Sequence, residues 1–189
     1  MDDVVIRPLR YGDLVALDQI DPNFVSESYL DVETEREGGS ITWRLVERPF
    51  KQPFQKEIGY RYDTAELART RLRLKEGRSL QLIAERAGRL VAILEVEPEE
   101  WRNTAIIWTL FVDTAARGRG LGRLLFERAV TWARERGFRA LVLETQTNNV
   151  PAVRFYQRLG CQTAGLDTYF YTNRDIANHE VALFLYYEL

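Results

Sequence analysis

The chain is poor in the residues that build disulfides and metal sites. Its 189 residues include one cysteine, Cys161, and one histidine, His179. A single cysteine cannot close an internal disulfide, so nothing in the sequence indicates an oxidising compartment. One histidine and one cysteine are also too few for the common zinc sites. We therefore expect no disulfide framework and no metal.

Long apolar runs are missing as well. No stretch approaches the ~20 apolar residues that a membrane-spanning helix needs, so we expect no membrane partner. The N-terminus, Met1–Val4, is acidic and lacks the basic start and apolar core of a signal peptide. Hydrophobic residues make up 46% and charged residues 29% of the chain, the balance of an ordinary globular protein. These features predict one cytoplasmic domain covering residues 1–189.

Charge is unevenly distributed along the chain. The 26 basic and 28 acidic residues give a net charge of −2, which does not indicate a nucleic-acid partner. Between residues 114 and 140, however, seven arginines face two glutamates. This segment therefore carries a charge of +5, and the rest of the chain carries −7. A basic segment in a weakly acidic protein indicates a local anion site.

Hydrophobic periodicity divides the chain into short elements. Alternating or continuous apolar residues predict strands at 4–7, 79–85, 90–96, 104–112, 140–143, 168–171 and 180–187. Helical spacing and glycine stops predict helices after residue 13 and at about 63–75, 121–136 and 150–159. Residues 21–62 are rich in glycine and proline and are expected to be irregular, apart from a strand-like run at 41–46. The order predicts an α/β (α+β) fold, with a mixed, mostly antiparallel central sheet of six to seven strands and helices on both faces.

A glycine-rich turn lies between a predicted strand and a predicted helix. Residues 117–122 read RGRGLG, and such a turn can point several backbone N–H groups at one anion. The start of the following helix adds roughly half a positive charge, which suits a pyrophosphate. A dinucleotide fingerprint needs a third glycine where Arg123 stands, and a Walker loop needs a Lys-Ser or Lys-Thr pair that is missing. A simple turn with solvated arginines is the alternative that the residues leave open.

Two ordered motifs give this turn a more specific interpretation. Residues 117–122 match the pattern Q/R-x-x-G-x-G/A, and residues 149–161 match N-x-x-A-x-x-F-Y-x-x-x-G-F with Cys161 in place of the last Phe. Together they resemble the GNAT (GCN5-related N-acetyltransferase) family, from about residue 79 to the C-terminus. Residues 143–152 and 181–187 are similar to the streptothricin acetyltransferase subgroup.

The resemblance implies a single GNAT domain that uses acetyl-CoA as co-substrate. Residues 1–78 would be the variable acceptor-side half and residues 79–189 the acetyl-CoA-binding half. The expected activity is direct acetyl transfer to a primary amine of a small molecule, such as a streptothricin-like antibiotic, in which case the enzyme would confer antibiotic resistance. A polyamine-like acceptor, a protein amine and a non-catalytic acetyl-CoA-binding module are the alternatives. A homodimer is also compatible with the family.

Three side chains are the candidates for proton transfer. The resemblance places Tyr156 beside the thioester sulfur, where its phenol could act as the acid. Many relatives carry a Glu in the strand before the glycine turn, but residues 106–112 contain no carboxylate. Glu95 and Glu144, or a chain of waters, are the substitutes for this base. Each glutamate could equally be an ordinary ion-paired residue.

The resemblance also implies the contacts of the co-substrate. The backbone of Phe111 and Val112 would pair with pantetheine as a strand edge does. The phosphates would meet N–H groups of the turn, which are those of Arg117, Gly118, Arg119, Gly120, Leu121 and Gly122. Asn149 and Tyr156 complete the set, and Asn149 could instead cap the following helix. Acidic and aromatic residues at 24–43 are candidates for the rim of the acceptor pocket.

Overall fold

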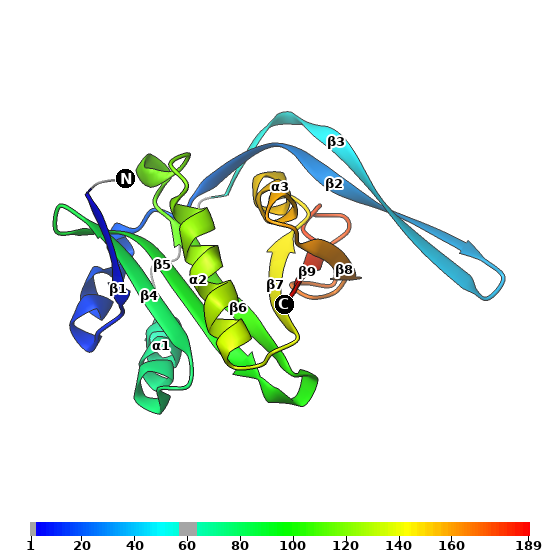
Figure 1. The fold of residues 1–189 in the computed structure, drawn as a ribbon. Coiled ribbons are helices and arrows are strands. Elements are labelled where there is room, and N and C mark those ends of the chain that lie inside the picture. Colours follow the sequence, from blue (N-terminus) through cyan, green and yellow to red (C-terminus); the bar gives the residue numbers. More distant parts are fainter. Residues whose placement is uncertain (1–2, 57–63) are drawn as a thin grey trace. The chain divides into compact units, whose positions relative to one another are not determined.

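The computed structural model describes residues 3–56 and 64–189 (Figure 1). The chain folds as two compact units that interleave along the sequence. The first unit comprises Met1–Asn23, Glu57–Leu143 and Glu188–Leu189, and the second comprises Phe24–Lys56 and Glu144–Tyr187. None of the helices in the described part of the chain is long and apolar enough to cross a membrane.

In the described part of the chain, the first unit holds five helices and four strands. Its elements are β1 (Val4–Pro8), η1 (Tyr11–Gln19), α1 (Thr64–Glu76), β4 (Leu80–Arg86), β5 (Arg89–Glu99), η2 (Glu100–Arg102), β6 (Thr104–Val112), η3 (Thr114–Ala116) and α2 (Leu121–Glu135). The strands β1, β4, β5 and β6 pair antiparallel in that order. Figure 1 shows α2 in front of these strands and α1 behind them.

The second unit contains a long hairpin and the C-terminal strands. Its elements are β2 (Phe24–Glu37), β3 (Ser40–Lys56), α3 (Val150–Arg158), β8 (Gln162–Asp167) and most of β9 (Ala182–Glu188). The strand β7 (Ala140–Gln146) contributes to both units, because the boundary falls between Leu143 and Glu144. The seven-stranded sheet has the order β1-β4-β5-β6-β7-β9-β8, and β6 and β7 pair in parallel. The predicted mixed, mostly antiparallel sheet is confirmed.

The two helices that the motifs border form for local reasons. In α2, Leu121, Leu125, Ala129 and Ala133 recur every four residues and are buried, so one face of the helix packs on the strands. In α3, the side chain of Asn149 accepts a hydrogen bond from the N–H of Ala152 at 3.2 Å, which caps the helix start. Both predicted helices are confirmed within one or two residues.

The prediction that residues 21–62 are irregular is wrong for the described part of that segment. The strands β2 and β3 pair antiparallel from Phe24↔Lys56 to Glu37↔Ser40, and Gly38 and Gly39 connect them. Gly38 has φ +56, which suits the tight two-residue loop of a hairpin. Pro49 and Pro53 are tolerated because β3 belongs to a two-stranded sheet and its register with β2 shifts between Ser26 and Ser28, which leaves Pro53 outside the paired residues. Residues 57–62 lie outside the described residues.

The strand predicted at 168–171 is also wrong. The strand in this region is β8, which ends at Asp167, and the chain then turns. The side chain of Asp167 accepts from the N–H of Tyr169, and Asp175 accepts from the N–H groups of Tyr171 and Thr172. Because these carboxylates bind backbone N–H groups that would otherwise pair with a neighbouring strand, the segment forms a turn where a strand was predicted.

Candidate functional site

The glycine turn of the first unit has the shape of an anion site. Gly118 and Gly120 have φ values of +74 and +81, in the left-handed region that favours glycine. A Cβ atom built on either residue would meet no heavy atom within 4 Å, so the space beside the turn is open. Gly120 is the N-cap of α2 and supplies no side chain to accept from the first N–H groups of the helix. These donors are suited to phosphate oxygens.

Arg117 and Asp113 hold this turn in place. The guanidinium of Arg117 donates from Nε to the carbonyl of Val112 at 2.9 Å and from Nη1 to the carbonyl of Asn23 at 2.6 Å. Asp113 is buried and accepts from the N–H of Ala115 at 2.9 Å and from Nη2 of Arg89 at 3.0 Å. Sequence reasoning missed Asp113, although an Asp directly after a strand is a typical cap.

The strand β6 approaches the turn through a bulge. On the β5 side, Glu95 is opposite Thr109 and Val96 is opposite Ile107, which leaves Trp108 as the extra residue. Its side chain is 55% exposed. Phe111 and Val112 follow at the end of β6 and are opposite Ile93 and Ala92. The parallel pairing of β6 with β7 runs from Thr104↔Ala140 to Ile107↔Leu143, directly before Trp108.

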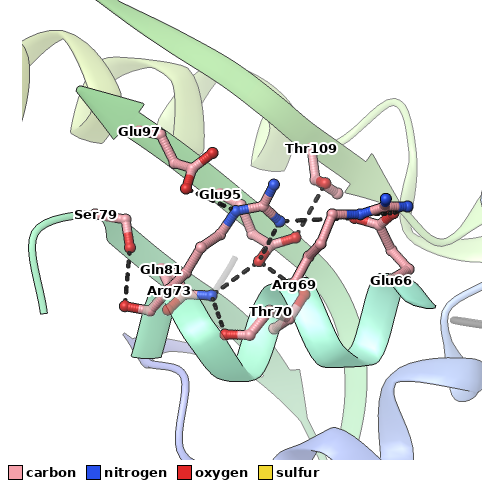
Figure 2. Close-up of polar contacts among 9 residues, drawn as sticks. All are labelled: Glu66, Arg69, Thr70, Arg73, Ser79, Gln81, Glu95, Glu97 and Thr109. Atoms are coloured by element: carbon pink, nitrogen blue, oxygen red, sulfur yellow. Dashed lines mark hydrogen bonds and ion pairs between the residues drawn. The ribbon is translucent and has the colours of Figure 1, made fainter. Parts of the chain in front are cut away.

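Glu95, a candidate base, lies at the centre of a buried hydrogen-bond network (Figure 2). Its side chain is fully buried. The oxygen Oε1 accepts from Oγ1 of Thr70 at 3.1 Å, from Nε2 of Gln81 at 2.8 Å and from Nη1 of Arg73 at 3.5 Å. The other oxygen, Oε2, accepts from Oγ1 of Thr109 at 3.1 Å. All four donors come from the protein itself, three at Oε1 and one at Oε2.

Arg73 connects this network to the bulge. It is buried, and ion pairs join it to Glu97 at 3.0 Å, to Glu95 at 3.5 Å and to Glu66 at 3.6 Å. Burial lowers the pKa of the Arg73 guanidinium, but the carboxylates, Glu95 foremost, raise it by more, so the group stays charged. Its guanidinium carbon lies over the ring of Trp108, 5.8 Å from the centroid.

The second candidate base, Glu144, has a different environment in the second unit. Burial raises the pKa of its carboxyl, and the hydrogen bond that it accepts from the hydroxyl of Tyr171 only partly opposes this shift. Lys56 and Glu180 form an ion pair and also act on Glu144 electrostatically, with opposite signs. A carboxyl with a raised pKa holds a proton more readily near neutral pH than an ordinary glutamate does.

Tyr156, the candidate acid, lies in the same unit as Glu144. It is a buried residue of α3, and its ring contacts that of Phe155 edge-on at 5.0 Å between centroids. Burial raises the pKa of the Tyr156 hydroxyl, and Cys161 and Glu144 raise it further, so the phenol is neutral at physiological pH. Burial likewise raises the pKa of the Cys161 thiol to about 12, which suits a core residue and not a nucleophile.

The structure therefore divides the predicted site residues between the two units. Glu144, Asn149 and Tyr156 belong to the second unit, and Tyr156 and Glu144 are close enough to interact electrostatically. The first unit contains Glu95 and the predicted co-substrate residues at 111–112 and 117–122. Among the acidic residues predicted to line the rim of the acceptor pocket, two are neutralised within the hairpin. Arg48 pairs with Asp31 at 2.7 Å and also with Glu33.

Comparison with known proteins identifies the class of this chain. The model of the acetyltransferase (GNAT) family matches residues 41–161, which is more than half of the chain. The chain therefore belongs to the GNAT family of acetyltransferases. Its motifs at 117–122 and 149–161 lie within the matched segment.

Within this family, the chain is similar to streptothricin acetyltransferases. It is 30% identical over 166 residues to that of Streptomyces lavendulae, covering 87% of this chain and 85% of that one. It is 37% identical over 87 residues to that of Escherichia coli, covering 46% of this chain and 50% of that one. Among solved structures, a Bacillus anthracis protein assigned as a streptothricin acetyltransferase, in complex with acetyl coenzyme A, has a TM-score of 0.76 and 25% identity, covering 98% of this chain and 99% of that one.

Proposed function

We propose that this chain transfers an acetyl group from acetyl-CoA directly to a primary amine of a small molecule, with a streptothricin-like antibiotic as the leading acceptor. The observation that carries the proposal is the 30% identity to the Streptomyces lavendulae enzyme over 87% of this chain. That match is too long to reflect the acetyl-CoA motifs alone, which occupy residues 117–122 and 149–161. A polyamine-like amine is the second acceptor to test.

The residues of the first unit fit the binding of acetyl-CoA, which supplies the acetyl thioester when bound. Open space beside Gly118 and Gly120 and the N–H groups at the start of α2, where the N-cap glycine supplies no capping side chain, are suited to its phosphates. The backbone of Phe111 and Val112 would pair with its pantetheine arm. The complex of the Bacillus anthracis neighbour with acetyl coenzyme A supports this assignment.

The amine must lose a proton before it can attack the thioester. An amine with a pKa of ~10.4 is neutral in roughly one molecule in 10³ to 10⁴ at pH 7, a deficit of ~4 to 5 kcal/mol. We assign the base to Glu144, because the raised pKa of its carboxyl makes it a better proton acceptor than an ordinary glutamate. Glu95 is a weaker candidate, because four protein donors already occupy its oxygens.

Tyr156 would supply the proton that the departing sulfur takes up. Its raised pKa keeps the phenol protonated, so a proton is held at Oη when the reaction begins. The electrostatic coupling of Tyr156 to Glu144 supports a single proton-handling group in the second unit.

The second unit also contains features that suit a cationic acceptor. The ring of His179 lies tilted against that of Tyr29, with 4.0 Å between centroids, and the ring of Phe50 lies 4.8 Å from that of Tyr29. Aromatic faces attract cations. These features support an acceptor with at least one ammonium group.

Thiol release from acetyl-CoA with a panel of amines tests the proposal. The panel contains streptothricin, spermidine, a peptide with a free N-terminus and a reaction without amine. We expect release with streptothricin to exceed release with the peptide. Release with the peptide alone would instead make the chain a protein N-acetyltransferase. Measurable binding of acetyl-CoA without release on any amine would make it a binding module.

A further inference from the structure

The bulge at Trp108 is held from two sides by one carboxylate. Glu95 is opposite Thr109, the residue directly after the extra residue of the bulge, and accepts its hydroxyl at 3.1 Å. The other oxygen of Glu95 binds Thr70 and Arg73 of α1 (Figure 2). The guanidinium of Arg73 in turn lies over the ring of Trp108. One side chain thus ties the strand after the bulge to the helix behind it.

The direction in which β6 continues depends on this bulge. A bulge bends its strand and increases its twist, so it sets the aim of the residues that follow. Phe111 and Val112 come three and four residues after Trp108 on the same strand. They are also the residues to which the proposed function gives the pantetheine contacts. A carboxylate that fixes the bulge therefore controls the orientation of Phe111 and Val112 toward the pantetheine arm.

We infer that Glu95 is a positioning residue, which fixes the bulge at Trp108 through Thr109 and Arg73 and so orients the strand end that receives acetyl-CoA. The inference rests on the proposed function and adds a role that does not involve proton transfer. Full burial of Glu95 and its four donors carry the argument, because three donors meet Oε1 and Thr109 meets Oε2, so both oxygens are engaged by contacts within the protein. Its lost hydration is replaced by contacts that define geometry.

The test compares Glu95→Gln and Thr109→Val with Thr109→Ser, which keeps the hydroxyl. The matched control is Glu100→Gln, which makes the same change at an exposed carboxylate paired with Arg78. Steady-state kinetics give KM for acetyl-CoA, kcat and the pH profile. Fluorescence anisotropy of Trp108, obtained as the difference between each variant and the same variant carrying Trp108→Phe, reports the bulge without any substrate.

We expect Glu95→Gln and Thr109→Val to raise KM for acetyl-CoA about ten-fold, since small displacements of substrate-positioning groups have effects of this order or larger. The Trp108 anisotropy should fall in both, the acid limb of the pH profile should remain, and Thr109→Ser should restore wild-type values. Loss of the acid limb with unchanged KM and anisotropy would make Glu95 the base and overturn the inference. A lower melting temperature without a change in KM or anisotropy would overturn it too, by leaving Glu95 a purely structural role.

The positioning role of Glu95 and the proposed acetyltransferase function can be contradicted independently of each other. The anisotropy measurement needs no acceptor and no turnover. It therefore tests whether Glu95 fixes the bulge at Trp108 even if no amine in the panel is acetylated. Binding of acetyl-CoA by calorimetry gives the same separation, because Glu95→Gln should weaken binding whether or not transfer follows. Unchanged anisotropy and unchanged binding in Glu95→Gln would remove the positioning role regardless of the activity of the wild-type protein.

Discussion

Glu95 and Glu144 are carboxylates of the same kind placed in contrasting surroundings. Glu95 lies in the first unit, is fully buried and accepts from Thr70, Arg73, Gln81 and Thr109. Glu144 lies in the second unit, accepts from the hydroxyl of Tyr171, and has Glu180 as well as Lys56 in its neighbourhood. In the first case four protein donors engage the carboxylate, and in the second burial raises the pKa of the carboxyl.

The contrast teaches that the position of a glutamate on a strand does not determine its role. A buried carboxylate surrounded by donors defines geometry, whereas one whose burial is opposed by few donors has a raised pKa and is a better proton acceptor. We therefore assign proton handling to the second unit, and substrate positioning to the first.

Replacing Tyr156 tests proton handling in the second unit most directly. We expect Tyr156→Phe to lower kcat by about 10³-fold, roughly 4 kcal/mol, because general acids contribute effects of this size. Binding of acetyl-CoA, measured by calorimetry, should be nearly unchanged. Tyr169→Phe, at a residue that is 70% exposed, is the matched control and should keep wild-type kcat. Unchanged kcat in Tyr156→Phe, with chemistry limiting the rate, would remove this residue from the mechanism.

Replacing Arg73 tests the closed network of the first unit through stability. Arg73→Met should lower the free energy of unfolding by about 3 kcal/mol, because it leaves the buried charge of Glu95 without its cationic partner. Arg69→Met removes an arginine from the same helix, where the side chain is 59% exposed and pairs with Glu66, and should cost less than about 1 kcal/mol. Urea unfolding measures both. Equal losses in the two variants would show that the buried network is not the stabilising feature.

Glu144→Gln tests the assignment of the base. We expect kcat to fall about 10²-fold and the acid limb of the pH profile to disappear, because the titrating carboxyl is gone. In the wild type this limb should lie above the ordinary pKa of glutamate, since the pKa of Glu144 is raised. Glu135→Gln on the exposed side of α2 is the control and should keep the limb. An acid limb that persists in Glu144→Gln would assign the base elsewhere.

The same substitution has a stability consequence of defined sign. A carboxyl whose pKa is raised in the folded state binds a proton more tightly there, so its contribution to stability falls as pH rises through that pKa. Glu144→Gln avoids this loss and should melt at a higher temperature than the wild type at about pH 8, with the difference vanishing near pH 4. A variant that is less stable at the higher pH would contradict the raised pKa.

Features that depend on neighbouring residues could be predicted from the sequence. The helices α2 and α3, the glycine turn and the Asn149 cap follow from local spacing and capping rules. The hairpin of β2 and β3 carried a signal as well, since Gly38 and Gly39 separate two strand-length segments by two residues. The prolines in β3 argued against a strand, and only the two-stranded pairing shows why they are tolerated.

The environments of the two glutamates could not be predicted in the same way. The donors to Glu95 come from residues 14 to 25 positions away, on α1, β4 and β6, so their convergence depends on the tertiary fold. The partner of Glu144, Tyr171, was expected on a strand and lies instead in a turn. A sequence pattern could identify both carboxylates as candidates, but it could not count the donors that distinguish them.

The smallest expected effect concerns the glycine turn, which should influence donor binding and leave proton transfer unchanged. Gly120→Ala should cost about 1 kcal/mol of stability, because φ +81 is strained for any residue with a Cβ, although no atom lies within 4 Å of the added methyl. Relaxation of that strain would move the first N–H groups of α2, so KM for acetyl-CoA should rise several-fold while the pH profile keeps its shape. Gly12→Ala, at a glycine without a positive φ and with equal space, is the control and should match the wild type. A changed acid limb in Gly120→Ala, with KM unaltered, would contradict the division between a positioning unit and a proton-handling unit.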